Sequence, residues 1–285
     1  MEIKKIFVAG AGLMGGGISQ VCAQAGYEVV MRDLTDEIIE KGLKAIRCSV
    51  VEGTVEEIMG RIHPTTELSM AKDVDFVFEA IIEKLEAKKD LFSQLDGICP
   101  GYTVFGSNTS AIPITEIAKA TKRGPQFVGT HFFSPVPMMR ICELVRGLET
   151  SDETMDIAEQ LGQSLGKETI RVNRDVAGFA LNRINFPSTV EAIKLVEAGV
   201  VSVEDVDKGM RLGFGRPMGP LETGDLAGLD VGFNAMSAVY KDTKDEKFRP
   251  PKLLEKKVEM GQLGRKTGIG WYKYDENGNK IGPAD

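Results

Sequence analysis

The feature that most constrains the fold is a glycine turn between a short apolar run and a helical pattern near the N-terminus. Residues 6–8 are Ile, Phe and Val, and they lead into the sequence GAGLMG at residues 10–15. Apolar residues then recur at helical spacing over Leu13–Ala25, and Tyr27–Met31 is a second apolar run. Because a buried parallel strand is apolar on both faces, Met1–Asp33 is predicted to form one β-α-β unit.

The glycine turn fits the G-x-G-x-x-G pattern of dinucleotide binding, which is informative here because a strand precedes it and a helix follows. Gly10 permits the tight turn, Gly12 lets the main chain approach a pyrophosphate, and Gly15 lets the helix pack closely on the strand. The start of the helix, at Leu13 and Met14, would then bind the phosphates through its N–H groups and its dipole.

An acidic residue, Asp33, lies at the end of the second strand, about 20 residues after the first glycine, where a carboxylate can hydrogen-bond the ribose of adenosine. It would repel a 2′-phosphate, as would Asp36 nearby, while strand alternation turns Arg32 away from Asp33. We therefore expect NAD rather than NADP. FAD is less favoured because a second flavin-binding motif is not found, and a glycine turn without a ligand is the structural alternative.

Strand and helix patterns continue to alternate up to about residue 172, which is typical of a Rossmann-type, doubly wound, mostly parallel α/β sheet. The pattern then becomes helical, and the start signal S-x-x-D begins one helix at Ser202. The predicted domains are residues 1–177, which bind the nucleotide, and residues 178–285, a smaller all-α domain. Further strands are expected over Val74–Phe78, Thr103–Gly106, Phe127–Thr130, Arg140–Val145, Glu168–Val172 and Trp271–Tyr274, and further helices over Leu85–Gly97, Ile114–Ala120, Asp152–Leu165, Phe179–Ala198, Ala227–Val239 and Pro251–Met260.

The composition excludes several classes of protein. A formal net charge of -7 leaves no basic excess for a nucleic-acid partner, and 42% hydrophobic residues is ordinary for a globular chain. Four cysteines without C-x-x-C spacing predict reduced thiols in or near the core, and two histidines in unrelated contexts argue against a metal site. No apolar run is long enough to span a membrane, and the chain enters its first strand without a signal peptide, so we expect a cytoplasmic protein.

His131 is the candidate general base, because it follows an apolar strand and ligands of open α/β sheets bind beyond the C-terminal strand ends. Glu143 on the next predicted strand could orient the imidazole, and the apolar turn at residues 132–137 could wall a site. A purely structural histidine is the alternative. The polar cluster at residues 107–110, Ser-Asn-Thr-Ser, either supplies hydroxyl donors to a substrate or caps the following helix.

Six motifs in order resemble the L-3-hydroxyacyl-CoA dehydrogenase family, close to its bacterial 3-hydroxybutyryl-CoA branch. The resemblance covers nearly the whole chain, and six spaced motifs are far more specific than any one of them. The motifs are GAGLMGGGIS at 10–19, SNTSA at 107–111, GTHFFSPVPMM at 129–139, DVAGFALNRI at 175–184, GRPMGPLETGDLAGLD at 215–230 and LGRKTGIGWYKY at 263–274.

The resemblance implies NAD-dependent oxidation of a 3-hydroxyacyl-CoA, or the reverse reduction, by a homodimer formed through the helical domain. It implies that His131 is the general base with Glu143 as its partner, and that Ser110 and Asn182 contact the substrate. The cofactor contacts that it implies are Asp33, Glu83, Lys88 and Lys266.

Two departures from the family pattern bear on substrate binding. Ser134 stands where the family usually has asparagine beside the nicotinamide, and the shorter side chain can lose or weaken a contact, a change of about 0.5–1.5 kcal/mol. Residues 41–62 are shorter than the family's two-helix arm, which contacts CoA, so that residues 47–61 alone remain to form it. The alternatives are a trimmed arm on an acyl-CoA enzyme or a changed acyl or carrier preference.

Two other functions remain open at this point. The shortened arm would suit a dehydrogenase of a free β-hydroxy acid, such as a sugar acid or carnitine. A non-catalytic nucleotide-binding relative is the second, although the presence of His131, Glu143, Ser110 and Asn182 speaks against it.

Overall fold

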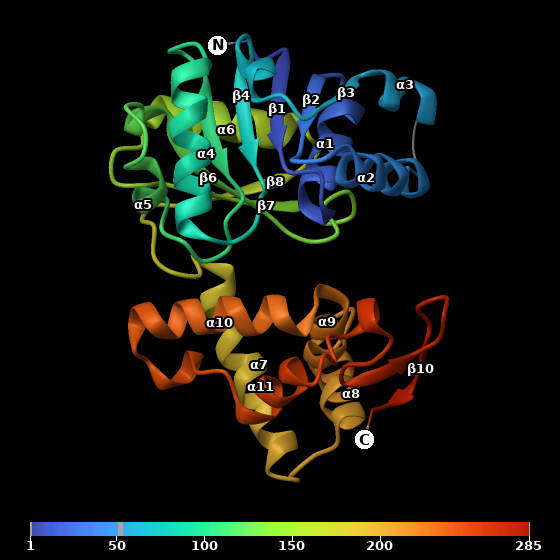
Figure 1. Ribbon diagram of the computed structural model, residues 1–285. Helices are drawn as coiled ribbons and strands as arrows, with labels where there is room; N and C mark the ends of the chain where they lie inside the picture. Colours follow the sequence, from blue (N-terminus) through green and yellow to red (C-terminus); the bar gives the residue numbers. More distant parts are fainter. Residues whose placement is uncertain (1, 51–53, 285) are drawn as a thin grey trace. The chain divides into compact units, whose positions relative to one another are not determined.

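The computed structural model describes residues 2–50 and 54–284 (Figure 1). The chain divides into two compact units, Met1–Val176 and Ala177–Asp285, which we call the N-terminal and C-terminal units. The first is an α/β sheet with helices on both faces and the second is mainly helical, so the predicted fold class is confirmed. Among the described residues, no helix has the length and apolarity that crossing a membrane requires.

The sheet of the N-terminal unit has the strand order β3-β2-β1-β4-β5-β6-β7-β8. All neighbouring strands are parallel except β6 and β7, which run antiparallel. The C-terminal ends of β1, β4, β5 and β6 therefore lie side by side along the same end of the sheet. The strands are β1 Lys5–Ala9, β2 Glu28–Arg32, β3 Ile62–Thr65, β4 Phe76–Glu79, β5 Val104–Ser107, β6 Phe127–Phe132, β7 Ile141–Val145 and β8 Glu168–Val172.

Helices cover both faces of this sheet, with α4 in front of it and α6 behind it in Figure 1. On the α1 and α6 face, Ile18 of α1, Met155 of α6 and Ile6 of β1 belong to one buried hydrophobic cluster. On the α4 face, the rings of Phe92 and Phe127 lie 4.6 Å apart. The helices are α1 Leu13–Gln24, α2 Asp36–Ser49, α3 Val55–Gly60, α4 Leu85–Ile98, α5 Ile114–Ala118 and α6 Asp152–Ser164, with short 3₁₀ turns at Leu68–Ala71 and Gly124–Gln126.

The C-terminal unit packs its helices around a core that contains Phe248 and Trp271. The predicted helix start after Ser202 is confirmed, because the Ser202 hydroxyl accepts a hydrogen bond from the Asp205 N–H at 3.1 Å. The elements are α7 Leu181–Glu197, α8 Val203–Phe214, α9 Pro220–Ala227, α10 Leu229–Thr243 and α11 Lys252–Glu259, 3₁₀ turns at Glu246–Phe248 and Arg265–Thr267, and the antiparallel pair β9 Tyr272–Tyr274 and β10 Lys280–Pro283.

A buried carboxylate ties the end of the chain to the helices of this unit. Asp225 on α9 is 1% exposed. It accepts hydrogen bonds from the main-chain N–H groups of Trp271 and Tyr272 and from the hydroxyl of Tyr274, each at 2.9 Å. Burial raises its pKa against the effect of these donors. Residues 271–274, which include β9, are therefore anchored to α9 by one side chain.

Several features differ from the sequence-based expectations or were absent from them, among them α2, α3 and β10, which were not predicted. Strand β3 was not predicted, and it contains Pro64, which an edge strand tolerates because its outer side needs no ladder hydrogen bond. Helix α9 forms within a stretch that reads as glycine- and proline-rich, with Pro220 in its first turn, where proline is favoured. The cysteines were expected in or near the core, but Cys48 is exposed whereas Cys22, Cys99 and Cys142 are buried.

Candidate active site

The glycine turn follows β1 and leads into α1, as the sequence indicates. Gly10 has a φ of +112°, and a Cβ there would lie 2.5 Å from the carbonyl oxygen of Ala80. A side chain at Gly15 would overlap the Gly10 carbonyl, whereas a Cβ at Gly12 would meet open space among the described residues. Gly12 is also the N-cap of α1, with no side chain to cover the first N–H groups of the helix. The turn therefore has no room for a side chain at Gly10 and Gly15, where it packs against its neighbours. It has free space at Gly12, where a pyrophosphate would approach.

Asp33 lies at the end of β2 and contacts the turn directly. Its carboxylate accepts hydrogen bonds from the main-chain N–H groups of Ala11 and Leu34, both at 2.7 Å. Arg32, by contrast, donates to the carbonyl of Thr66 at 3.1 Å, away from the turn. The acidic residue, rather than the basic one, is the charged side chain beside the glycine turn, which suits an unphosphorylated ribose.

His131 and Glu143 face each other across the one antiparallel pair of the sheet. They are direct partners in the β6–β7 register, and His131 Nδ1 lies 2.7 Å from Glu143 Oε2. His131 is 4% exposed and Glu143 is fully buried. The ring of Phe133 lies 4.6 Å from the imidazole. This is an imidazole whose orientation a buried carboxylate fixes, at the C-terminal end of β6.

Ser110 is held by its main chain in the loop after β5. Its N–H donates to Glu83 Oε1 at 2.8 Å, and the Thr109 hydroxyl donates to the same oxygen. The helix-capping alternative for this cluster does not hold for α5, whose N-cap is Pro113, without a side-chain cap. Residues 107–110 instead join the loops that follow β4 and β5.

Lys88 and Glu79 lie beneath that loop. Lys88 Nζ is 2.6 Å from Glu79 Oε1 and 3.1 Å from Glu83 Oε2. Lys88 is 1% exposed, and Glu79 is fully buried at the end of β4. Burial works against the charge on Lys88, but the two carboxylates outweigh it and raise its pKa, so the side chain is a buried cation at neutral pH.

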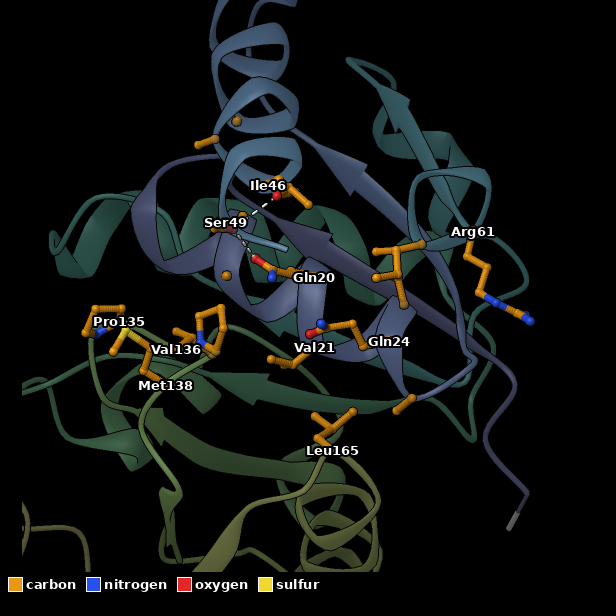
Figure 2. A pocket seen from close by; sticks show the side chains of 18 of the residues that line it. Gln20, Val21, Gln24, Ile46, Ser49, Arg61, Pro135, Val136, Met138 and Leu165 are labelled. Atoms are coloured by element: carbon orange, nitrogen blue, oxygen red, sulfur yellow. Dashed lines mark hydrogen bonds between the residues drawn. The ribbon is translucent and has the colours of Figure 1, made fainter. Parts of the chain in front are cut away.

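A groove of about 1290 Å³ runs from the glycine turn along α1 (Figure 2). Helices α1, α2 and α3 line it, together with the loop after Ser134 and the turn between α6 and β8. Val21, Ile46 and Leu165 supply apolar surface, and the Ser49 hydroxyl, bonded to Gln20 Oε1 at 2.7 Å, supplies a polar point.

The loop over one side of the groove is tied to the sheet by a buried lysine. Lys167 Nζ donates to the carbonyl oxygens of Val136 and Met139 at 2.7 and 2.8 Å. Burial lowers the pKa of this lysine. Ser134, at the start of the loop, is exposed. The expected arm at residues 47–61 is formed by the end of α2 and by α3, and its residues 51–53 lie outside the described residues.

The remaining predicted residues lie in the C-terminal unit. Asn182 is half-buried in the first turn of α7, and Lys266 Nζ is 2.5 Å from Asp230 Oδ1. Across residues 2–50 and 54–284, no group of three or more His, Cys, Asp or Glu side chains could hold a metal ion.

The sequence did not single out Glu79, and it gave Asn108 no role beyond its place in the polar cluster at residues 107–110. Glu79 ends an otherwise apolar strand, and Asn108 Oδ1 accepts a hydrogen bond from the Phe132 N–H at 2.8 Å, which joins the β5 loop to the strand of His131. The signal available in the sequence for Glu79 was a charged residue at the end of an apolar run.

A Rossmann sheet with a glycine turn, an acidic β2 end and a histidine–glutamate pair defines a dinucleotide-dependent oxidoreductase.

Comparison with known proteins defines the family. The model of the 3-hydroxyacyl-CoA dehydrogenase NAD-binding domain matches residues 5–176, and that of the C-terminal domain of 3-hydroxyacyl-CoA dehydrogenase matches residues 178–274. The probable 3-hydroxybutyryl-CoA dehydrogenase of Bacillus subtilis is 43% identical over 285 residues, covering 97% of this chain and 99% of that protein.

Solved structures agree. M. tuberculosis FadB2 matches with a TM-score of 0.93 and 38% identity, and (S)-3-hydroxybutyryl-CoA dehydrogenase PaaH1 from Ralstonia eutropha matches with 0.88 and 39%. Each match covers 96% of this chain and all of the other. The chain belongs to the 3-hydroxyacyl-CoA dehydrogenase family and is an NAD-dependent oxidoreductase, which confirms the resemblance and the choice of NAD.

Proposed function

We propose that the protein interconverts a short-chain L-3-hydroxyacyl-CoA, such as 3-hydroxybutyryl-CoA, and the 3-oxoacyl-CoA, with His131 as general acid and base. The observation that carries the proposal is the buried His131–Glu143 pair at the C-terminal end of β6, in a unit that binds NAD. The short acyl chain is inferred from the relatives, whose names specify 3-hydroxybutyryl-CoA.

The route of the proton follows from the geometry of the His131–Glu143 pair. With Nδ1–H donating to Glu143, a neutral imidazole keeps its lone pair on Nε2. In the oxidative direction His131 Nε2 accepts the proton of the C3 hydroxyl as hydride leaves the same carbon. Bound NAD supplies the acceptor for that hydride. Glu143 then stabilises the imidazolium, and the reverse reaction returns the proton through the same nitrogen.

Other side chains bind the reactants in this proposal. Ser110 and Asn182 hold the substrate oxygens. The cofactor is held by the turn at Gly10, Gly12, Leu13, Met14 and Gly15 and by Asp33, Glu83, Ser134 and Lys266, and Lys88 acts on it through Glu83.

The first test is His131→Ala. The general base contributes roughly 10²–10⁴ in rate, so turnover should fall by that factor while NADH binds with unchanged affinity. His63→Ala is the matched control, since His63 is exposed on the β3 edge and bonds Glu28 at 2.7 Å. Full turnover by the His131 variant would remove this residue from the mechanism.

A substrate panel separates the proposal from its two alternatives. NADH formation is compared for 3-hydroxyacyl-CoAs of increasing chain length and for free 3-hydroxybutyrate. Higher kcat/KM on the thioester supports the proposal, and higher kcat/KM on the free acid supports a β-hydroxy acid dehydrogenase. Tight NADH binding without turnover on any of them would indicate a non-catalytic relative.

The groove beside α1 is proposed to receive part of the CoA carrier. It is partly apolar, and Lys41 and Arg140 among its lining residues suit the phosphates of CoA. Lys41→Ala should raise KM for the acyl-CoA and leave KM for free 3-hydroxybutyrate and NADH affinity unchanged. Lys44→Ala, on the same helix but outside the lining, is the control.

We also propose a homodimer formed through the C-terminal unit and a location in the cytoplasm. Exposed apolar side chains support the first, among them Ile184, Leu212 and Phe214 at 72%, 76% and 77% exposure. Four cysteines without a disulfide support the second, because a reducing compartment keeps thiols free. Phe214→Glu should shift the sedimentation coefficient towards that of a monomer if the dimer forms there.

A further inference from the structure

Glu79 is a carboxylate without exposed surface, placed directly under the ligand-binding edge of the sheet. Oε1 accepts hydrogen bonds from Lys88 Nζ at 2.6 Å and from the Ile81 N–H at 2.9 Å. Oε2 accepts one from the Ser107 hydroxyl at 2.6 Å. A buried ion pair is weak support for stability by itself, because desolvation offsets the attraction between the charges. The Glu79–Lys88 ion pair matters here because Glu79 is connected through it to the Ser110 loop and through its main chain to the glycine turn.

The first connection runs through Lys88 to the loop of Ser110. Lys88 also pairs with Glu83 Oε2, and Glu83 Oε1 accepts the N–H of Ser110 and the hydroxyl of Thr109. Burial would raise the pKa of Glu83, but Lys88 and these hydrogen bonds outweigh it and lower the pKa. One cation therefore holds two carboxylates, and the outer carboxylate holds the loop.

The second connection runs through the main chain of β4. Glu79 is paired with Ala9 of β1, and the next residue, Ala80, packs its carbonyl against Gly10 of the glycine turn. The Glu79 carbonyl accepts the N–H of Asn108 at 2.8 Å, and the Asn108 side chain holds the N–H of Phe132, next to His131.

We propose that Glu79 is a positioning residue that sets the geometry of the cofactor turn and of the Ser110 loop through Lys88 and Ser107. It contacts neither reactant and acts through the groups that do. Lys88, which is 1% exposed, is a positioning residue in the same sense. It fixes Glu83 and affects cofactor binding through that contact. The part that concerns Ser110 rests on the function proposed above, whereas the part that concerns NAD does not.

The test measures NADH affinity in Glu79→Gln by fluorescence titration. Glutamine keeps the shape and one acceptor but removes the charge, so that Lys88 is left with Glu83 alone and draws it from the Ser110 loop. We expect the Kd for NADH to rise about tenfold, the effect of losing one charge-assisted hydrogen bond. Ser107→Ala removes a single contact of Glu79 and should raise Kd by about two- to threefold.

Asp96→Asn is the matched control for lost stability. Asp96 also neutralises a buried cation, because its Oδ1 accepts from Arg123 Nε at 2.5 Å. Arg123 also bonds the carbonyl oxygens of Pro100 and Thr103, which precede β5 and so lie at the opposite end of that strand from Ser107. Asp96→Asn should lower the melting temperature about as much as Glu79→Gln and leave the Kd for NADH unchanged.

A double-mutant cycle separates positioning from general loosening. If Glu79 acts through Glu83, the Glu79→Gln and Glu83→Gln effects on NADH affinity should not add, and the double variant should bind about as weakly as the weaker single one. Additive effects, or a Kd for Glu79→Gln within about twofold of the unchanged protein, overturn the proposal. Should Glu79→Gln not fold, an unchanged Kd in Ser107→Ala overturns it. Absence of turnover on every acyl-CoA would count against the proposed function and leave the NADH readout intact.

Discussion

The two units each bury a carboxylate, and they satisfy it by different chemistry. Glu79 in the N-terminal unit binds a buried cation, Lys88, which in turn binds a second carboxylate. Asp225 in the C-terminal unit accepts two main-chain N–H groups and one tyrosine hydroxyl, all neutral.

The difference corresponds to two tasks: Glu79 positions a loop that binds a ligand, and Asp225 anchors the end of the chain. A charged chain of three side chains can reach from a strand end to a loop that binds a ligand, as Glu79, Lys88 and Glu83 do. A carboxylate with neutral donors binds one segment closely, and a Cβ at Gly264 or Gly270 would overlap Asp225. The first arrangement lies beside the proposed site, and the second closes the chain end on its own core.

Lys88→Met should have the largest effect on stability, because it leaves Glu79 buried without a counter-ion. We expect a loss of about 3–5 kcal/mol in the free energy of unfolding of the N-terminal unit. Urea denaturation followed by circular dichroism measures it. Lys89→Met, which removes a surface lysine 3.5 Å from Glu86, should cost about 0.5 kcal/mol or less. Equal losses of free energy in the two variants would contradict the claim that Glu79 depends on Lys88 as its buried counter-ion.

Asp225→Ala leaves three donors without their acceptor and should cost about 2–4 kcal/mol in the C-terminal unit. Trp271, the single tryptophan, donates to Asp225 and is 1% exposed, so its fluorescence reports unfolding of this unit. The transition seen by fluorescence should move to lower urea more than the one seen by circular dichroism. Asp242→Ala, at an exposed position of α10, is the control and should move neither.

Glu83 and Asp225 should contribute to the pH dependence of unfolding with opposite signs. The lowered pKa of Glu83 means that its contribution is present above its ordinary value of 4.5 and is lost as the pH falls through the folded value. The raised pKa of Asp225 means that its contribution is present below 3.8 and is lost as the pH rises through the folded value. Unfolding midpoints between about pH 3 and pH 7 should show that Glu83→Gln flattens a rising limb and Asp225→Asn a falling one. Limbs of the same sign would contradict this assignment.

The smallest predicted effects come from a matched pair of helix caps. The hydroxyls of Ser151 and Ser202 each accept a hydrogen bond from an N–H three residues on, at 3.1 Å, one at the start of α6 and one at the start of α8. Each change to alanine should cost about 1 kcal/mol, and each change to threonine less. Ser202→Ala should shift the Trp271 transition and Ser151→Ala should not; equal shifts would contradict the assignment of the two caps to separate units.

Local pattern was sufficient for most elements of the fold. The bounds of β8 agree with the predicted Glu168–Val172, and α1 and α6 each end within one residue of the predicted position. Strand β3 was missed because His63 and Pro64 interrupt its apolar pattern, and only its place at the sheet edge makes such a strand stable.

The site was less accessible from sequence. His131 and Glu143 could be placed on neighbouring strands, but their 2.7 Å contact depends on the antiparallel register of β6 and β7. Glu79 is 9 positions from Lys88 and 28 from Ser107, so its contacts exist only once helix α4 and strand β5 have packed beside β4. The roles of these residues stay predictions until the variants are measured.

The one reversal of direction in the sheet has a consequence for how this chemistry tolerates change. Because residues 131 and 143 are cross-strand partners, their spacing is set by the ladder of main-chain hydrogen bonds and not by the connection between them. That connection, residues 133–140, can lengthen, shorten or exchange side chains without moving the imidazole from its carboxylate. Slipping either strand by a single residue would turn one partner to the far side of the sheet.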